Sequence, residues 1–435
     1  MATARQLRRI IGEGGAREAL ERLYGRGPGK AEAAARRYVR LLDRFLSAFD
    51  GDAEAELFSA PGRTEIGGNH TDHNHGRVLA AAVDVDAIAV ACRCGDGRAV
   101  VESEGFPRQE IGLDVTEPLE AEKGTPSAVV RGVCARMKAC GHAVGGFRAC
   151  VESAVPMGSG LSSSAAYEVL IGTVVNGLYN GGRVPDVEIA RIGQWAENHH
   201  FGKPCGLMDQ TASAVGGFVA IDFRDPAAAV VRKVGFDFAS SGHALVIVAT
   251  GGSHADLTGQ YAAIPEEMKS VARELGGGVL RDVSREAVAA AIPRLRARVG
   301  DRALLRALHF FDDDLRAAGE ADALERGDFP AFLRLVHESG VSSATLLQNV
   351  WPPDSPREQG LSLALALSRD ALRGRGACRV HGGGFAGTIQ AFVPEDLLEG
   401  YLSRLRAVFG GESCLCAAVR SAGAVRVETA KGRSA

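Results

Sequence analysis

The sequence contains no apolar run long enough to cross a membrane, and residues 1–9 lack the apolar segment of a secretory signal peptide. It also lacks an excess of one charge, because 50 basic residues face 53 acidic ones and the net charge is −3. Nucleic acid and anionic membranes bind proteins through massed positive charge, so neither is expected as a partner. We expect a cytoplasmic protein that acts on small molecules, as a monomer or a weak homo-oligomer.

Cysteine spacings of the metal-binding kind are missing as well. The nine cysteines are an odd number, spread along the chain without a CxxC pair. Such a pattern indicates neither a zinc ribbon nor a disulfide framework. It favours free thiols in a reducing compartment.

A chain of 435 residues exceeds what one hydrophobic core usually supports, so two domains are expected. Apolar residues make up 46% of the sequence and charged residues 24%, as in ordinary globular proteins. The texture changes from strand-rich to helix-rich near residues 225–242. We therefore divide the chain into an N-terminal helical extension at 1–54, a first domain at 55–235 and a second domain at 236–435.

Hydrophobic periodicity predicts a mixture of helices and strands, and hence an α+β fold. Residues 30–49 form the clearest amphipathic helix, with apolar side chains at steps of three and four: Tyr38, Leu41, Leu42, Phe45 and Phe49. Residues 56–101 indicate short strands around a polar, histidine-rich loop. Further helices are predicted at 127–140 and 185–201, and the stretch 256–373 is predicted to be mainly helical.

The chain is organised around residues 155–166, VPMGSGLSSSAA, which lie between a predicted strand and a predicted helix. Gly158 and Gly160 let the backbone approach an anion, and the first turn of the helix directs its free N–H groups at the negative charge. The serines at 162–164 add hydroxyls for phosphate or a metal ion. The alternative is an ordinary N-capped helix after a tight turn. The lysine of the Walker A loop is absent.

A second polar stretch, PGRTEIGGNHTDHN at 61–74, places many hydrogen-bonding side chains between glycines. Asn69, His70 and Asp72 offer donors and acceptors that suit sugar hydroxyls. Two other interpretations stay open. The histidines at 70, 73 and 75 are candidate metal ligands, although no carboxylate or cysteine stands at a familiar spacing, and the loop is alternatively only solvated.

Two further stretches contain acids and glycines. Glu197 lies near the end of a predicted helix, and Asp209 follows a Gly-x-Pro turn in a segment that includes Gly206. An acid at a helix end can bind a metal ion, and an acid just past a turn can accept a proton. The alternative is that each is a surface carboxylate. The glycines of HGGGFAG at 381–387 let a backbone turn pack closely against a loop or a ligand.

Together these stretches resemble the motifs of the GHMP sugar and mevalonate kinases, in the same order, and most closely those of galactokinase. The resemblance covers roughly residues 57–393. It implies a two-domain GHMP kinase fold with the active site between the domains. It also implies a transfer of the γ-phosphate of ATP, with Mg²⁺, to the anomeric hydroxyl of galactose or a close relative.

The resemblance further implies roles for individual residues. Asp209 would act as the base toward the anomeric hydroxyl, and Arg63 would stabilise charge on the transferring phosphoryl group. Mg²⁺ would be held by Ser164 and Glu197. The nucleotide would be bound by Ser103, Gly158, Ser159, Gly160, Leu161, Ser162, Ser163 and Ser164. The sugar would be contacted by Asn69, His70, Asp72, Gly206 and Tyr261, and His254 keeps the family's spacing to Tyr261.

Some positions depart from the galactokinase pattern. Asn69 stands where galactokinases carry Glu, His73 where they carry Tyr, and Ala386 where glycine is usual. These changes spare the phosphate and base positions but affect the sugar pocket. An amide at position 69 does not repel a sugar carboxylate, so we expect weaker selectivity against sugars altered at C5 or C6. The alternatives are a kinase for galacturonate, L-arabinose or N-acetylgalactosamine, or a catalytically inactive sensor of sugar and nucleotide.

Overall fold

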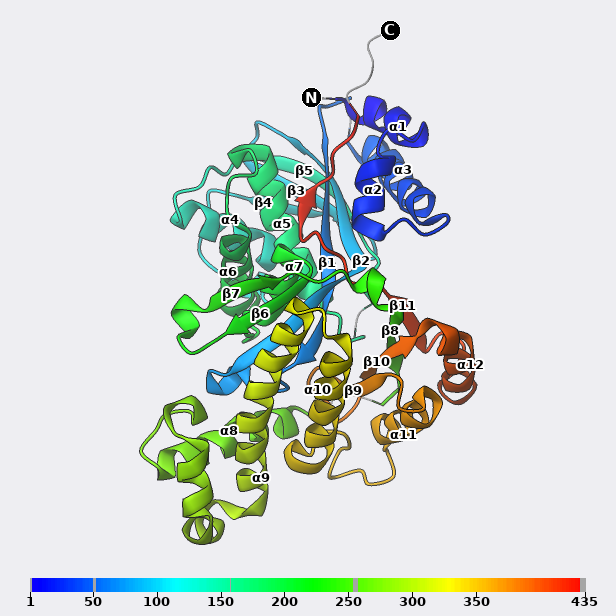
Figure 1. The fold of residues 1–435 in the computed structure, drawn as a ribbon. Helices are drawn as coiled ribbons and strands as arrows, with labels where there is room; N and C mark the ends of the chain where they lie inside the picture. Colours follow the sequence, from blue (N-terminus) through cyan, green and yellow to red (C-terminus); the bar gives the residue numbers. More distant parts are fainter. Residues whose placement is uncertain (1, 50–51, 157, 253–256, 431–435) are drawn as a thin grey trace.

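Two β-sheets flanked by helices make up the computed structural model, which describes residues 2–49, 52–156, 158–252 and 257–430 (Figure 1). The larger sheet has eight strands: β1 (Glu56–Gly67), β2 (Arg77–Arg93), β3 (Arg98–Ser103), β4 (Gln109–Gly112), β5 (Phe147–Ser153), β6 (Phe218–Asp222), β7 (Val230–Val234) and β12 (Val425–Arg426). Its main order is β12-β1-β2-β5-β3-β4, with β6 paired to β2 and β7. Only the β3–β5 pair among the described strands is parallel.

The region predicted to contain short strands instead holds two long ones. β1 has 12 residues, all buried, and β2 has 17. A strand covered on both faces lacks the alternation that marks a half-buried one, and runs such as 80–82 are alanine only. Because small apolar residues occupy both faces, the hydrophobic periodicity did not predict the full length of these strands.

Helices cover both faces of the larger sheet. On one face lies the N-terminal extension, which consists of α1 (Ala4–Gly12), α2 (Arg17–Tyr24) and α3 (Lys30–Ala48). The amphipathic helix predicted at 30–49 is thus α3, and its predicted apolar side chains are buried. On the other face lie α4 (Pro126–Ala139), α5 (Ser163–Asn180), α6 (Asp186–Ala196) and α7 (Met208–Val215).

The smaller sheet is antiparallel, in the order β11-β8-β10-β9. Its strands are β8 (His243–Ala249), β9 (Ala377–His381), β10 (Thr388–Pro394) and β11 (Cys414–Ala417). One face is covered by α11 (Gly360–Leu372) and α12 (Leu398–Phe409). Leu245 and Phe392 on its other face join the core of the larger sheet, together with Phe332 of α10 (Phe329–Ser342).

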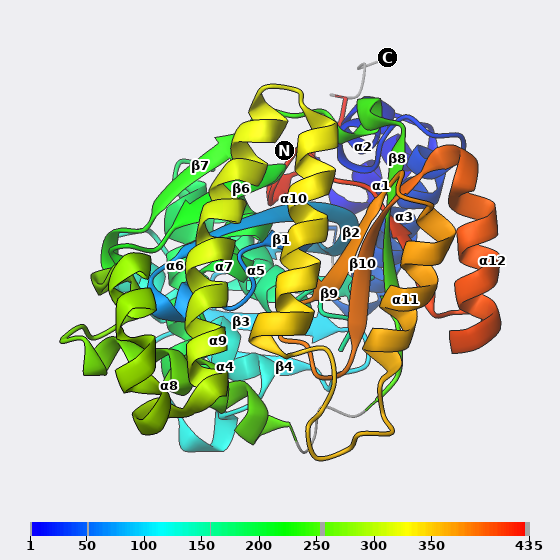
Figure 2. The same cartoon turned by 60° about the horizontal axis from the view of Figure 1, so that its bottom comes forward.

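The stretch after residue 256 is mainly helical, as predicted. It contains α8 (Thr258–Glu274), α9 (Arg285–Glu325) and α10, and α9 is interrupted at Gly300, where φ is 82°. Figure 2 shows α9 and α10 lying across the junction between the two sheets. Residues that join the sheets therefore come from these helices as well as from the strands.

The end of the chain returns to the larger sheet. Arg420 N–H bonds to Ala82 O at 2.9 Å, and Val425 of β12 pairs with Ser59 of β1. The smaller sheet begins at His243, after the predicted boundary at residue 235. Residues 419–420 and 425–427, although assigned by sequence to the second domain, pair with strands of the larger sheet.

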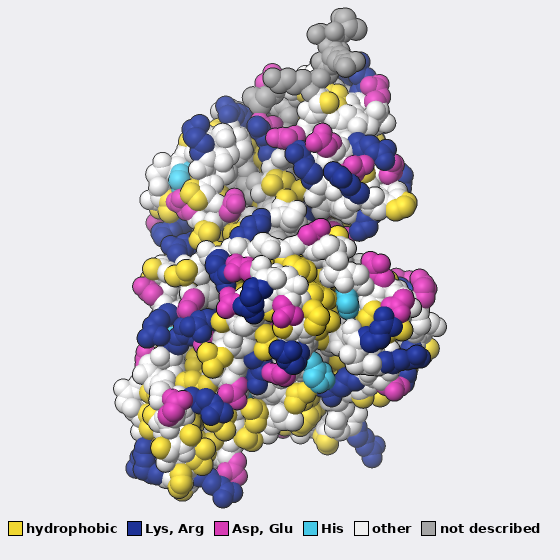
Figure 3. All heavy atoms as spheres, viewed as in Figure 1, with side chains coloured by type: hydrophobic (Ala, Val, Ile, Leu, Met, Phe, Trp, Pro, Cys, Tyr) yellow, Lys and Arg dark blue, Asp and Glu magenta, His cyan; other side chains and the backbone are white. Residues whose placement is uncertain are grey.

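Surface charge and cysteine state agree with the composition. Figure 3 shows basic and acidic side chains interspersed over one face of the molecule. All nine cysteines lie in the described ranges, and all are free thiols. Among the described residues, none of the helices is long and apolar enough to span a membrane.

Candidate active site

Arg63 and Asp209 form the centre of the site. Arg63 lies on β1 just after a register shift, and Asp209 lies in the first turn of α7. The Arg63 guanidinium donates from Nε to Asp209 Oδ1 at 2.7 Å and from Nη2 to Oδ2 at 2.5 Å. Arg63 is buried, whereas the Asp209 side chain is 28% exposed. The structure thus joins the two predicted catalytic residues and leaves the carboxylate accessible.

The Asp209 carboxyl is held ionised. Burial acts to raise its pKa, but the charge and hydrogen bonds of Arg63 and the Ser162 hydroxyl outweigh burial and place the pKa below its ordinary value. Ser162 Oγ donates to Asp209 Oδ2 at 2.7 Å. The carboxylate therefore keeps its charge at neutral pH, which suits a group that accepts or orients a proton.

The serine loop, residues 158–164, opens α5 as predicted. Gly158, Gly160 and Ser162 all have positive φ, of 73°, 75° and 57°. Ser162 occupies the N-cap position, but its side chain makes no capping bond because its hydroxyl binds Asp209. The first turn of this 18-residue helix therefore keeps backbone N–H groups that no serine caps. The ordinary N-capped helix, our alternative interpretation, is not what the structure contains.

A chain of polar side chains ties the serine loop to the smaller sheet. His381 lies within hydrogen-bonding distance of Thr64 and of Thr388, at 3.1 and 3.0 Å, and Thr388 Oγ1 donates to Ser159 O at 3.2 Å. A Cβ on Gly160 would lie 2.8 Å from His381 Nδ1, which only glycine avoids. The positive φ and this close approach together explain the glycine. No local sequence pattern indicates this contact, because its residues are distant in the chain.

Two buried carboxylates lie beside the serine loop. Glu168 follows Ser164 by four residues on α5, so both lie on one face of the helix. Gln210 Nε2 donates to Glu168 Oε2 at 2.8 Å and to Glu197 Oε2 at 3.1 Å, while the Oε1 atom of each acid has no hydrogen-bond partner. Burial, and then the charge of Glu197, raise the pKa of Glu168 well above its ordinary value.

Ser164, Glu197 and Glu168 thus offer hard oxygen atoms in one place, which is the donor set that Mg²⁺ prefers. Unbonded buried carboxylate oxygens also fit a cation better than an ordinary core. Lys203 Nζ lies 3.5 Å from Glu197 Oε1 and supplies one positive charge. Glu168 was not predicted as part of a metal site, although its spacing of four residues from Ser164 indicates that both lie on one face of a helix.

The predicted sugar-side residues meet at the glycine motif, residues 381–387. Asn69 Nδ2 donates to Gly382 O, His70 Nε2 lies 2.9 Å from Gly383 O, and Tyr261 Oη donates to Gly384 O. The histidine loop, residues 69–76, comes from the β1–β2 connection, and Tyr261 comes from α8. Three consecutive carbonyl groups therefore bind the side chains of three residues that are predicted to contact the sugar. His254 lies outside the described residues.

Asp72 and Gly206 also lie close together. A Cβ on Gly206 would be 3.1 Å from Asp72 Oδ2. Asp72 Oδ1 accepts from the His73 N–H at 2.9 Å, so one carboxylate oxygen is held while the other faces the Gly206 segment. The charge of Asp72 also acts on Arg63, so these two residues lie near the centre of the site.

The side chain of Asn69, which we predict to contact the sugar, is hydrogen-bonded within the protein at every polar atom. The side chain is fully buried, and both its N–H groups are used, by Glu65 and by Gly382 O. Its Oδ1 accepts from Asn349 at 2.8 Å and from Ser343 at 3.2 Å. A sugar would have to break one of these bonds to reach it, so the arrangement does not favour a direct contact.

Ser103 and the histidines complete the predicted set. Ser103 ends β3 opposite Val151 of β5, the strand that leads to the serine loop, and its buried hydroxyl makes no hydrogen bond. Its role in nucleotide binding stays a prediction. His70 is held by Gly383, and His73 is exposed. Within the described ranges, no group of three or more His, Cys, Asp or Glu side chains could hold a metal ion.

Glu65, behind the histidine loop, makes a testable contribution to stability. Burial raises its pKa to about 7, against the opposing charge of Arg379 and the bond from Asn69. The unfolded carboxyl titrates near 4.5, so between these values only the folded state keeps the proton. Stability should therefore fall as pH rises from 4.5 to 7, by about 3 kcal/mol from this group.

The test compares urea unfolding of wild type and Glu65→Gln between about pH 5 and 8. The wild type should lose more stability than the variant over this range. Glu120→Gln, at an exposed position, is the control and should follow the wild type. Parallel curves for wild type and Glu65→Gln would show that Glu65 does not titrate there.

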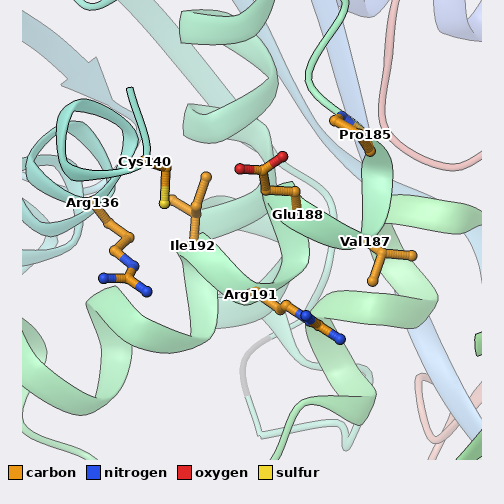
Figure 4. Close-up of a pocket in the computed structure, with 7 residues that line it drawn as sticks. All are labelled: Arg136, Cys140, Pro185, Val187, Glu188, Arg191 and Ile192. Atoms are coloured by element: carbon orange, nitrogen blue, oxygen red, sulfur yellow. The ribbon is translucent and has the colours of Figure 1, made fainter. Parts of the chain in front are cut away.

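A cavity of about 430 Å³ lies apart from this cluster, between α4 and α6 (Figure 4). Its lining includes Arg136, Cys140 and Glu188. Figure 4 shows Arg136 on one side and Arg191 on the other, and Glu188 is 2.8 Å from His142. None of the predicted site residues lines it.

Comparisons with known proteins identify the family of the chain. The sequence matches the family described as "GHMP kinases N terminal domain" over residues 128–217 and the "Galactokinase galactose-binding signature" over residues 43–93. A galactokinase from Streptomyces coelicolor is 33% identical over 354 residues, which are 81% of this chain and 87% of that protein. The two family matches contain the serine loop with Asp209 and the histidine loop, respectively.

Solved structures show the same fold. A galactokinase from Lactococcus lactis, crystallised with galactose, superposes with a TM-score of 0.73 at 24% identity, over 88% of this chain and 98% of that one. A mevalonate kinase from Methanococcus jannaschii superposes with a TM-score of 0.60 at 14% identity, over 85% and 99% of the two chains. The α+β fold expected from the motifs is thereby confirmed.

Proposed function

Because the chain belongs to the GHMP kinase superfamily as a galactokinase-like sugar kinase, we propose that it transfers the γ-phosphate of ATP to the anomeric hydroxyl of galactose or a close relative. The observation that carries the proposal is the Arg63–Asp209–Ser162 cluster at the open N-terminus of α5. A phosphate held by this helix end lies next to both a positive charge and a carboxylate. Phosphoryl transfer depends mainly on such positioning and charge neutralisation.

Different residues of the chain bind the phosphates, stabilise their charge and accept the proton. The serine-loop N–H groups, together with the helix dipole of α5, hold phosphate oxygens. Arg63 is fixed by Asp209 and by Gly160 O, so its charge is in place before the substrate arrives. Asp209, ionised at neutral pH, accepts or orients the proton of the attacking hydroxyl.

Ser164 and Glu197 would hold Mg²⁺, and Glu168 would support them. The metal would neutralise charge on the β- and γ-phosphates and orient them for transfer. Gln210 keeps the two carboxylates at a fixed separation by binding one oxygen of each. The remaining oxygens make no hydrogen bond and would face the cation, with Lys203 Nζ 3.5 Å from that of Glu197.

Ser164→Ala and Glu197→Gln should each raise the Mg²⁺ concentration needed for half-maximal rate, by about tenfold or more, because each removes an oxygen ligand. Sugar binding in the absence of nucleotide should stay as in the wild type. Titration of ADP release with Mg²⁺ measures the first effect, and calorimetry with sugar alone measures the second. Glu412→Gln, on an exposed turn, is the control. An unchanged metal requirement in both variants removes these residues from the site.

The sugar is proposed to bind among His70, Asp72, Gly206 and Tyr261. Burial lowers the pKa of His70 to about 4, so its ring is neutral. Because Gly383 O can only accept, Nε2 donates to it and Nδ1 is left as an acceptor for a sugar hydroxyl. Asp72 lies close to Gly206, which precedes Asp209 by three residues.

We place this site between a first domain at 55–235 and a second at 236–435, with the extension at 1–54. Arg63, the serine loop and Asp209 belong to the first part, and the glycine motif and Tyr261 belong to the second. We propose a monomer or weak homo-oligomer in the cytoplasm. The free thiols of all nine cysteines support a reducing compartment.

An ADP-release assay with a panel of sugars tests the function. The panel contains galactose, galacturonate, L-arabinose and N-acetylgalactosamine, each with ATP and Mg²⁺. We expect ADP release with at least one of them, and phosphorus NMR of the product should place the phosphate on C1. Binding of sugar and nucleotide without ADP release from any of them would instead support the inactive sensor.

A further inference from the structure

Side chains hold the glycine motif by donating hydrogen bonds to its carbonyl groups. Among these side chains, that of Asn69 makes the most hydrogen bonds. Gly382 O accepts from Asn69 Nδ2 at 2.9 Å, and Gly383 O accepts from Asn349 Nδ2 at 3.1 Å. Asn349 also donates to Asn69 Oδ1 at 2.8 Å. The two asparagines therefore form one unit that spans the histidine loop and the glycine motif.

Every polar atom of Asn69 is bonded to the protein. Its N–H donates to Asp313 Oδ2 at 2.8 Å, and its C=O lies 2.9 Å from His309 Nε2. Both of these partners lie on α9, and both are buried. Asn69 thus fixes the start of the histidine loop to α9 through its backbone and to the glycine motif through its side chain.

Glu65 and Arg379 orient the Asn69 amide. Glu65 Oε1 accepts from Asn69 Nδ2 at 2.9 Å and from Arg379 Nη2 at 2.9 Å. Because Oε1 already accepts from Arg379, it acts as an acceptor toward Asn69 as well, and it selects the orientation of Asn69 in which the NH₂ group faces it and Gly382 O. Arg379 is fully buried on β9, the strand that leads into the glycine motif.

We propose that Asn69 is a positioning residue, which holds His70 and the glycine motif in the geometry that binds the sugar, and does not contact the sugar itself. The proposal rests on the sugar kinase function proposed above. His70, the next residue, and Tyr261 both donate to carbonyl groups of this motif. A shift of the Gly382–Gly384 backbone would therefore move both of these side chains together.

Asn69→Asp is the sharpest test, because the size of the side chain is kept while both N–H donors are lost. The new oxygen would face Glu65 Oε1, which accepts from Arg379, and Gly382 O, so it would meet two acceptors. We expect the KM for sugar to rise by about tenfold or more, as for the loss of one to two buried hydrogen bonds. The Kd for nucleotide, measured without sugar, should stay within about twofold of wild type.

A second replacement should restore function. In the double variant Asn69→Asp/Glu65→Gln the donor and the acceptor are exchanged. The amide introduced at position 65 can donate to the carboxylate introduced at position 69, and the total charge is unchanged. We expect the double variant to recover a part of the lost kcat/KM for sugar. Recovery is not expected if residue 69 touches the sugar, because Glu65 lies behind Asn69 and is itself buried.

Asn180→Asp is the matched control. This buried asparagine exchanges two hydrogen bonds with the Ala143 backbone, in a different part of the protein. It should lower the unfolding temperature but keep the KM for sugar. Asn349→Asp should raise the KM for sugar as Asn69→Asp does, and it provides the test if Asn69→Asp fails to fold.

Distinct results overturn distinct claims. If the wild type phosphorylates none of the sugars, the proposed function fails. If the wild type is active, an unchanged KM in Asn69→Asp and Asn349→Asp overturns the positioning role. The ratio of turnover for the two best sugars should stay near its wild-type value in Asn69→Asp. A changed ratio, without rescue by Glu65→Gln, would show direct contact and overturn the proposal.

Discussion

Asp209→Asn is expected to fold and bind nucleotide as the wild type does, while kcat falls by about 10²–10⁴-fold. The amide has nearly the same shape as the carboxylate but no charge, and it cannot take a proton from a hydroxyl. In either orientation of the amide, its NH₂ group would also face a nitrogen of Arg63, which can only donate. The variant therefore loses the proton acceptor and the ordered contact with Arg63 together.

Single-turnover measurements separate this loss from binding. Phosphoryl transfer should be slow at saturating sugar and ATP, with the Kd values for both ligands close to wild type. Asp396→Asn, an exposed carboxylate paired with Arg375, is the matched control and should keep full activity. Turnover of Asp209→Asn near the wild-type rate would exclude Asp209 as the base.

Arg63→Ala is expected to lower kcat by about 10³-fold, as when a preorganised charge is removed from a transition state. It should also change the pH dependence. In the wild type, burial would raise the pKa of Asp209, and Arg63 is the first group that opposes it. Without the guanidinium the pKa of Asp209 rises, so the acidic limb of kcat/KM moves to higher pH.

The pH profile distinguishes this explanation from a general loss of structure. Arg63→Lys keeps a positive charge without the bidentate contact, so its acidic limb should lie between those of wild type and Arg63→Ala. Added guanidinium ion should restore part of the activity of Arg63→Ala and return the limb toward lower pH. Arg375→Ala, at an exposed ion pair, should match the wild type. An acidic limb that stays fixed in Arg63→Ala would show that Arg63 does not set the charge state of Asp209.

Features that depend on neighbouring residues were predictable from the sequence. The apolar spacing of residues 30–49 predicted α3, and glycines followed by serines predicted the start of α5. Glu168 was predictable in the same way, since it lies one helical turn after Ser164. The lengths of β1 and β2 were not, because both faces of these strands are buried and their residues do not alternate.

Contacts between distant parts of the chain lay beyond the sequence. Asn69 has partners at positions 313, 343, 349 and 382, and nothing in the local pattern around it identifies them. The resemblance to galactokinases predicted sugar contact for Asn69 and none of these partners. Glu65 accepts a hydrogen bond from the amide that was expected to face the sugar.

The return of the chain end to the larger sheet has a consequence for synthesis on the ribosome. β1 pairs with β12, and about 190 residues separate β12 from the predicted end of the first domain. At ordinary translation rates these residues take about 10 to 40 s to make. For that time the nascent chain carries β1 with its outer edge unpaired, and such an edge is prone to pair with other chains. The larger sheet is therefore completed only when residues 425–426 have left the ribosome.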